Sequence, residues 1–168
     1  MKKTIILLAA ALIMFSCGND NKTKQQTESS TKETVKKEPI KETSSNEITL
    51  LLSSNDQMQY DKKELKVKVG QKVTLTLKHT GTMAKDVMGH NFVLLKKDVD
   101  VPTFAEKAVA ATATEYIPEG DDIIIYTKLI GGGESVTITF DAPAKGSYDY
   151  ICSFPGHYAL MKGKFIVE

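Results

Sequence analysis

The most constraining feature of the sequence is a ten-residue stretch near its C-terminal end that carries three side chains able to bind a metal: Cys152, His157 and Met161. A thiolate and an imidazole suit both Cu(I) and Cu(II), whereas one cysteine without a carboxylate is a poor match for Mg²⁺, Ca²⁺ or a structural zinc site. A trigonal site of two imidazoles and one thiolate, with a distant thioether, lets an electron move with little reorganisation. The stretch therefore predicts a copper loop that the rest of the fold must hold.

The second imidazole has to come from elsewhere, and the chain has three histidines: His79, His90 and His157. His90 lies in Met88-Gly89-His90-Asn91, immediately before the apolar run 92–95. A histidine at the start of a strand can meet a C-terminal loop in space. Taken singly, such a cysteine is usually a small buried hydrophobe, a histidine a satisfied polar group and a methionine part of the core. Their joint spacing, with the flanking residues described below, favours copper instead.

From Glu47 onward the chain shows the alternation of half-buried strands. Apolar residues alternate over 65–69 and again over 73–77, and Gly70-Gln71 between the two runs predicts a hairpin with one solvated face. The further strand-like runs are 47–52, 91–96, 123–127, 136–140, 148–152 and 164–167. About eight short strands predict an all-β sandwich.

One stretch departs from this β pattern, and it predicts a single helical insertion over residues 100–112. Pro102 suits the first turn of a helix after a cap at Asp100. Four apolar residues then fall on one helical face: Phe104, Ala105, Ala108 and Val109. The strand that ends at Cys152 and the one that begins at Lys164 would hold the copper loop, eleven residues long, at one end of the sandwich.

The first residues resemble a bacterial lipoprotein signal. Lys2 and Lys3 precede an apolar run over 5–15 that is too short to span a bilayer, and Ser16-Cys17 closes it. We expect residues 1–16 to be removed and Cys17 to carry lipid, which would anchor the protein to a membrane in the periplasm. The alternative is an ordinary signal peptide cleaved near Ser16, with Cys17 incidental.

Residues 17–46 predict a lipidated cysteine followed by a disordered tether. The segment is rich in Lys, Glu, Thr, Ser and Gln and almost free of apolar side chains, so it cannot bury enough surface to offset the entropy of ordering. The alternative, an interaction tail that folds on a partner, lacks an amphipathic pattern. The formal net charge of +1 gives no reason to expect a nucleic-acid partner.

Four stretches of the chain resemble azurins, blue-copper proteins of the cupredoxin family. They are Met88-Gly89-His90-Asn91, Cys152-Ser-Phe-Pro-Gly-His157-Tyr-Ala-Leu-Met161-Lys-Gly163, Asn55-Asp-Gln-Met-Gln-Tyr60 and Thr127-Lys-Leu-Ile-Gly131. The likeness covers residues 47–168 and implies a cupredoxin Greek-key β-sandwich there.

The resemblance also implies a set of copper ligands. Copper would be held by His90, Cys152 and His157, with Met161 and the carbonyl oxygen of Gly89 as weak axial ligands. For Gly89 the alternative is a glycine required by a positive-φ turn. Asn91 would tie the two ligand loops together, although it could equally be a turn asparagine bonded to its own backbone. The Phe154 amide would donate to the Cys152 sulfur.

Three positions depart from the azurin pattern or add to it. Azurins usually carry a disulfide, but this chain has only Cys17 and Cys152, and the first is assigned to lipid. Phe92 stands where azurins commonly have tryptophan. His79, eleven residues before His90, corresponds to a histidine that titrates and couples to the copper in azurins. A histidine without such coupling is the preferred alternative.

These features predict an electron-transfer protein rather than an enzyme. Copper saturated by protein ligands leaves no position for a substrate, and the chain lacks the histidines for the second copper centre of a nitrite reductase. A copper carrier or store is the alternative function. In the resembling family the imidazole edge of the corresponding histidine reaches the surface inside an apolar patch, so the resemblance implies that single electrons pass through His157. The monomer would meet redox proteins such as c-type cytochromes or copper reductases transiently through that patch. The patch comprises Met58, Met88, Phe154, Pro155, Gly156 and Ala159, of which Met58 and Met88 could instead belong to the core.

Overall fold

The computed structural model describes residues 46–168. The predicted leader over 1–16, the lipidated Cys17 and the tether up to residue 45 lie outside the described residues and stay predictions. Among the residues described, no helix is both long enough and apolar enough to cross a membrane.

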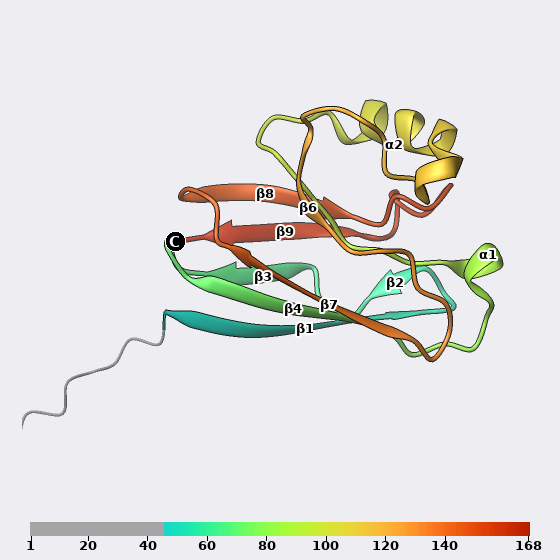
Figure 1. Ribbon diagram of the computed structural model, residues 1–168, viewed down its shortest axis with the longest axis horizontal. Coiled ribbons are helices and arrows are strands. Elements are labelled where there is room, and N and C mark those ends of the chain that lie inside the picture. The colour runs from blue at the N-terminus through green and yellow to red at the C-terminus, as the bar shows by residue number, and fades with distance from the viewer. Residues whose placement is uncertain (1–45) are drawn as a thin grey trace, which may run out of the picture. The chain divides into compact units, whose positions relative to one another are not determined.

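Within residues 46–168, nine strands form two sheets that face each other across one core (Figure 1). The four-stranded sheet has the order β2-β1-β4-β7 and the five-stranded sheet the order β3-β9-β8-β5-β6. The strands are β1 (Glu47–Asn55), β2 (Gln59–Tyr60), β3 (Glu64–Val67), β4 (Lys72–His79), β5 (Val93–Leu95), β6 (Ile123–Tyr126), β7 (Ser135–Asp141), β8 (Gly146–Ile151) and β9 (Lys162–Val167). This is the predicted all-β sandwich, and the two-residue β2 is the strand that periodicity missed.

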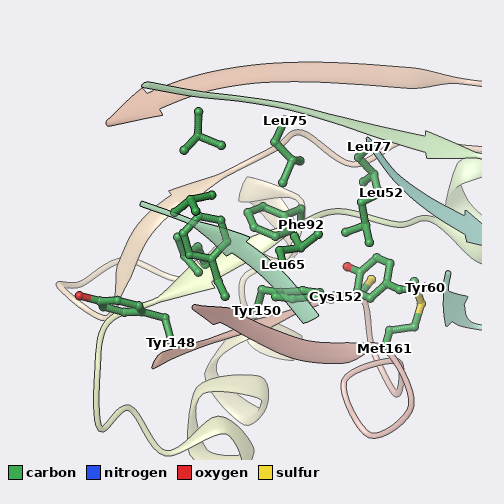
Figure 2. Packing of buried hydrophobic residues seen from close by; sticks show 14 of the residues in the cluster. Leu52, Tyr60, Leu65, Leu75, Leu77, Phe92, Tyr148, Tyr150, Cys152 and Met161 are labelled. Carbon is green, nitrogen blue, oxygen red and sulfur yellow. The ribbon is translucent and has the colours of Figure 1, made fainter. Parts of the chain in front are cut away.

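The alternating pattern of the strands places the core between the sheets. In β4, Val73, Leu75 and Leu77 are fully buried, whereas the residues between them reach solvent. The opposite sheet contributes Tyr150 and Phe165 to the same cluster. Figure 2 shows Tyr60, Cys152 and Met161 at one end of this core and Tyr148 at the other.

The predicted hairpin of residues 65–77 is wrong. β3 pairs in parallel with β9, whereas β4 pairs in parallel with β1 and antiparallel with β7, so the two segments belong to different sheets. Gly70, at φ 76°, lies in the connection between β3 and β4, which leads from the five-stranded sheet to the four-stranded sheet. Alternation fixes which face of a strand is buried, and both sheets bury a face against the same core. The pattern therefore could not show which neighbour each strand pairs with.

The helical insertion is confirmed as α2 (Val101–Ala110). Asp100 caps it by accepting a hydrogen bond from the Thr103 backbone N–H at 3.0 Å. Phe104 and Ala108 pack on the outer face of the five-stranded sheet, against Val93, Leu95 and Ile151. Val109, predicted on the buried face, is 49% exposed. Two single turns complete the helical part: α1 (Lys85–Met88) and the 3-10 turn η1 (Thr112–Thr114).

The predicted copper loop lies between β8 and β9. β8 ends at Ile151 and β9 begins at Lys162, so the loop spans residues 152–161 and is one residue shorter than predicted. The segment before β5 is fixed by an isolated bridge, in which the N–H groups of His90 and Ile130 each donate to the other residue's carbonyl at 2.9 Å. The loop 152–161 and the segment that carries His90 are therefore both fixed to the sheet by backbone pairing.

Candidate metal centre

Three donor atoms from two distant parts of the chain meet at one end of the sandwich. The sulfur of Cys152 lies 3.6 Å from Nδ1 of His157 and 3.9 Å from Nδ1 of His90. All three donor atoms lie within 4.8 Å of one another, and all three residues are buried. The arrangement brings together the cysteine and the two histidines that the sequence singled out.

The loop reaches this shape through a chain of short-range backbone hydrogen bonds. The His157 N–H donates to the Phe154 carbonyl at 3.0 Å, and the Met161 N–H donates to the His157 carbonyl at 2.8 Å. The Cys152 N–H donates to the Met161 carbonyl at 2.9 Å, which closes the loop onto the strand ends. Gly156 has φ 80°, a conformation that favours glycine. Hydrogen bonds within its own backbone thus hold the loop in this conformation.

The protonation chemistry of the three donors fits a soft cation. Burial lowers the pKa of His90 and of His157 to about 4, so that at neutral pH each ring is uncharged and keeps a nitrogen lone pair. Burial raises the pKa of the Cys152 thiol to about 12, although the backbone N–H groups of Asn91 and Phe154 donate to the sulfur and oppose the rise. A thiolate at this position needs a positive charge beside it, which a bound metal ion supplies.

Gly89 packs too closely for any other residue. Its φ is −69°, so the interpretation as a positive-φ turn is wrong. A Cβ at this position would lie 2.4 Å from the Lys85 carbonyl oxygen and 2.7 Å from Cδ2 of Leu129. The Gly89 carbonyl oxygen lies 3.8 Å from the Cys152 sulfur, at the edge of the donor cluster.

Met161 is fully buried at the same end of the core as Cys152 (Figure 2). Its backbone is held at both polar atoms within the loop, by His157 and by Cys152. This position is compatible with the predicted axial role.

Asn91 joins the two connections that carry the donors. Its side-chain amide donates to the Ser153 hydroxyl at 2.8 Å, and its side-chain oxygen accepts from the Ser153 N–H at 2.9 Å. Both residues are buried. The side chain therefore bonds across to the loop after β8 rather than to its own backbone.

His79 is fully buried and touches His90. The two ring centroids are 4.3 Å apart, and Nε2 of His79 lies 3.1 Å from a carboxylate oxygen of Asp56. Within residues 46–168, Nδ1 of His79 has no hydrogen-bond partner. This contact gives a route for coupling to His90, and whether the coupling exists stays a prediction.

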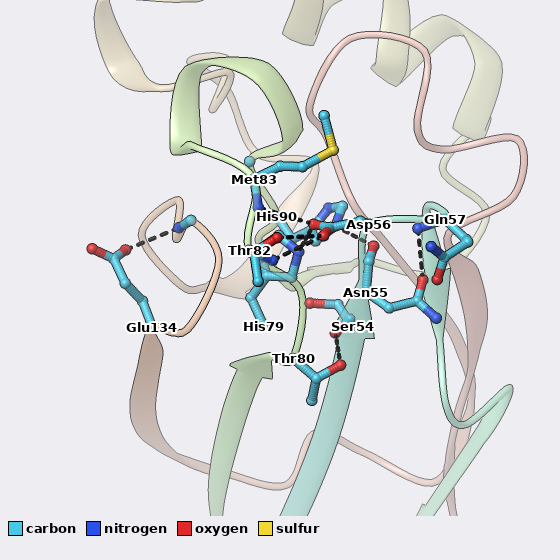
Figure 3. Close-up of polar contacts among 12 residues, drawn as sticks. Ser54, Asn55, Asp56, Gln57, His79, Thr80, Thr82, Met83, His90 and Glu134 are labelled. Carbon is cyan, nitrogen blue, oxygen red and sulfur yellow. Dashed lines mark hydrogen bonds and ion pairs between the residues drawn. The ribbon is translucent and has the colours of Figure 1, made fainter. Parts of the chain in front are cut away.

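The segment 55–60 contributes contacts that sequence reasoning did not foresee (Figure 3). The Asn55 carbonyl lies 2.9 Å from Nε2 of His90, which must be the donor because a carbonyl only accepts. The Asp56 carboxylate also accepts from the backbone N–H groups of Thr82 and Met83. The likeness of this segment to azurins was the only signal in the sequence, and it did not indicate these roles.

The surface over the donor cluster is partly apolar. Of the predicted patch, Gly156 and Ala159 are exposed, whereas Met58, Met88, Phe154 and Pro155 are half-buried. Met58 and Phe154 also pack against the core. The structure adds two exposed residues that the sequence did not indicate, Val87 at 55% and Leu160 at 53% exposure.

Sequence comparison identifies relatives of the described domain. Residues 46–168 match the profile described as copper binding proteins, plastocyanin/azurin family. Azurin-2 of Alcaligenes xylosoxydans xylosoxydans is 49% identical over 118 residues, which cover 67% of this chain and 91% of azurin-2. Outer membrane protein H.8 of Neisseria meningitidis is 46% identical over 118 residues, which cover 67% of this chain and 63% of that protein. The match thus spans less than two thirds of the length of H.8.

Solved structures give the same result. Reduced auracyanin from Roseiflexus castenholzii superposes with a TM-score of 0.65 at 40% identity, covering 71% of this chain and 96% of auracyanin. An azurin from Methylomonas sp. strain J superposes with a TM-score of 0.63 at 35% identity, covering 73% of this chain and 97% of that azurin. These likenesses confirm the predicted cupredoxin sandwich.

Proposed function

The chain belongs to the plastocyanin/azurin family of copper-binding proteins, and on that premise we propose that it is a type 1 copper protein that carries single electrons between redox partners. The observation that carries the proposal is the convergence of the Cys152 sulfur with Nδ1 of His90 and Nδ1 of His157 in a buried cluster. Bound copper would supply one-electron chemistry by cycling between Cu(I) and Cu(II).

We assign the ligands by their donor atoms. His90, Cys152 and His157 would form the trigonal set, with the Met161 thioether and the Gly89 carbonyl as weak axial donors. Such a set leaves no position for water or substrate, which is why we propose electron transfer rather than an enzymatic reaction. Asn91 and the Phe154 N–H would hold the ligand loops and the sulfur in place.

The burial of the donors supports electron transfer over the carrier alternative. A protein that hands copper to an acceptor has to expose its ligands to that acceptor, whereas Cys152 and Met161 are fully buried and His157 is 3% exposed. An electron needs no such opening. It can leave through the imidazole of His157, the least buried of the three.

The partners we propose are redox proteins such as c-type cytochromes or copper reductases, which the monomer would meet transiently. The apolar surface around the loop would exclude water during brief docking without strong charge pairing. The patch that we assign to this role is the predicted set with Val87 and Leu160 added.

We further propose that Cys17 anchors the protein to a membrane in the periplasm. The Ser16-Cys17 sequence supports this, and one relative carries the name outer membrane protein H.8. Mass spectrometry of the membrane fraction should find a lipid on Cys17, and a free soluble N-terminus there would exclude the anchor.

The decisive experiment is a visible absorption and electron paramagnetic resonance spectrum of the full chain titrated with Cu(II). An intense blue thiolate-to-copper band with narrow hyperfine splitting is expected, and Cys152→Ser should abolish it. Cys17→Ser is the matched control, because it removes the other cysteine and should leave the spectrum unchanged. A colourless or weakly absorbing complex of the unaltered protein would favour the carrier.

A further inference from the structure

The hydroxyl of Tyr60 lies against the segment that carries His90. Tyr60 ends the two-residue strand β2 and is 4% exposed. Its hydroxyl donates a hydrogen bond to the backbone carbonyl of Asn91. Burial raises the pKa of Tyr60 well above 10, and Cys152 and Tyr150 add to the rise. The hydroxyl therefore stays protonated, and remains a donor, throughout the neutral range.

Asn91 is held at its side chain, its carbonyl and its N–H. The side chain bonds to Ser153 at two points, the carbonyl accepts from Tyr60, and the backbone N–H donates to the Cys152 sulfur. A rotation of the Asn91 backbone that weakened the N–H···S contact would also disturb the bond to Tyr60. The hydroxyl is thus linked to the sulfur through one intervening residue.

The segment that carries Tyr60 is itself held by strand pairing and side-chain hydrogen bonds. Ser54 and Asn55 of β1 pair with Tyr60 and Gln59 of β2, and the Asn55 side chain accepts the N–H groups of Gln57 and Gln59 at 3.1 and 3.2 Å. The Asn55 carbonyl also receives the His90 ring. One hairpin therefore holds two successive residues, His90 through its imidazole and Asn91 through its carbonyl.

We propose that Tyr60 is a positioning residue of the copper site, whose hydroxyl keeps the Asn91 N–H directed at the Cys152 sulfur and so tunes the electron density of the thiolate. Hydrogen bonding around the cysteine sulfur is one of the factors that set the reduction potential of blue-copper sites. The inference rests on the proposed function, because the tuned bond is the one between thiolate and copper.

The chain offers a matched control in Tyr150. It is fully buried in the same core, its ring centroid is 5.7 Å from that of Tyr60, and its hydroxyl also donates to a backbone carbonyl. That carbonyl belongs to Lys62, at 2.7 Å, and not to either ligand segment. Tyr60→Phe and Tyr150→Phe therefore remove the same group from the same core and differ in what the group holds.

The test compares the full chain with these two variants, each loaded with Cu(II). A donor to the sulfur withdraws electron density from it and favours the reduced state, so Tyr60→Phe should lower the reduction potential and shift the thiolate-to-copper band. Tyr150→Phe should leave both unchanged. In the copper-free protein, the Ser153 N–H should exchange with deuterium about two- to tenfold faster in Tyr60→Phe alone, the effect of one lost hydrogen bond.

Ser153→Ala provides a second variant, because it removes the acceptor of the Asn91 amide while keeping Tyr60, and its potential should shift in the same direction. If the unaltered protein is blue and Tyr60→Phe matches it in potential, band and exchange, the positioning role is overturned. Equal shifts in Tyr60→Phe and Tyr150→Phe would overturn it too, since both would reflect a general change in the core. An unaltered protein without a blue band would contradict the proposed function and remove the basis of this inference with it.

Discussion

The Nε2 atom of His90 lies 2.9 Å from the carbonyl oxygen of Asn55, and this contact decides which ring nitrogen is free. The carbonyl can only accept, so Nε2 carries the proton and Nδ1 keeps its lone pair. Nδ1 is the atom 3.9 Å from the Cys152 sulfur. The hydrogen bond to the hairpin of β1 and β2 thus leaves Nδ1 of His90 free to bind a metal before any metal is present.

The first prediction concerns this tautomer. In the copper-free protein at pH 7, His90 should be neutral and protonated at Nε2, because the Asn55 carbonyl favours that form. Two-bond ¹H–¹⁵N correlation spectra distinguish the two ring nitrogens directly. A spectrum with the proton on Nδ1 would contradict the assignment of the donor atom.

The second prediction concerns acid stability without copper. The pKa of His90 and of His157 is lowered from 6.5 to about 4, chiefly by burial, so below pH 6.5 the unfolded chain takes up protons that the folded protein does not. The free energy of unfolding should level off above about pH 7.5, where both imidazoles are neutral in the unfolded chain as well. It should fall by on the order of 1 to 2 kcal/mol between pH 6.5 and 5, allowing for partial solvent screening.

Urea unfolding at several pH values measures this slope above the range in which carboxylates titrate. His157→Asn should reduce the slope by about half, because one of the two rings is gone. A slope that does not change in this variant would show that other groups are responsible.

The third prediction concerns Gly89. An alanine Cβ would lie 2.4 Å from the Lys85 carbonyl, so the backbone beside His90 has to shift. We expect Gly89→Ala to cost about 1–3 kcal/mol of stability and to move the blue absorption band. Gly70→Ala is the control: at φ 76° with no atom within 4 Å, it should cost about 1–2 kcal/mol from backbone strain alone and leave the spectrum unchanged. An unaltered band in Gly89→Ala would show that the position of the Gly89 carbonyl does not affect the copper site.

The fourth prediction concerns the docking surface. Leu160 is 53% exposed in the loop beside His157, and Leu51 is 51% exposed on the outer face of β1. Leu160→Lys should slow electron self-exchange by about tenfold or more, because two charged, hydrated surfaces have to be brought together. Leu51→Lys introduces the same charge away from the loop and should have little effect. Nuclear magnetic resonance line broadening in mixtures of oxidised and reduced protein measures the rate, and equal effects of both variants would exclude a local patch.

Much of the candidate site could be predicted from sequence because its metal-binding donors are side chains that can be recognised by residue type. Cys152 and His157 lie in one loop of metal-binding side chains, and His90 was singled out because it precedes a strand-like run. The supports of the site were not predictable in the same way. Asn55 acts through a backbone carbonyl and Tyr60 through a hydroxyl bound to another carbonyl, and such contacts depend on tertiary structure rather than on side-chain type.

The fold shows the same division. The periodicity of 73–77 correctly identified the buried residues of β4, yet it could not decide that β4 pairs with β1 and β7. In α2 the apolar spacing identified Phe104 and Ala108, but Val109 lies just beyond the stripe that the sheet covers. The local sequence pattern determines which residues of an element are buried. Which strands pair with one another depends on how the whole core packs.

The parallel pairing of β3 with β9 joins Glu64 to Lys164, across most of the described sequence. Contacts so distant along the chain form slowly, because the loop between them must close before any pairing energy is gained. The strand β9 also anchors the far end of the loop that begins at Cys152. Until β9 is paired, the loop cannot enclose the Cys152 thiol, which is fully buried only in the folded domain. The thiol is therefore open to oxidation during that interval of folding.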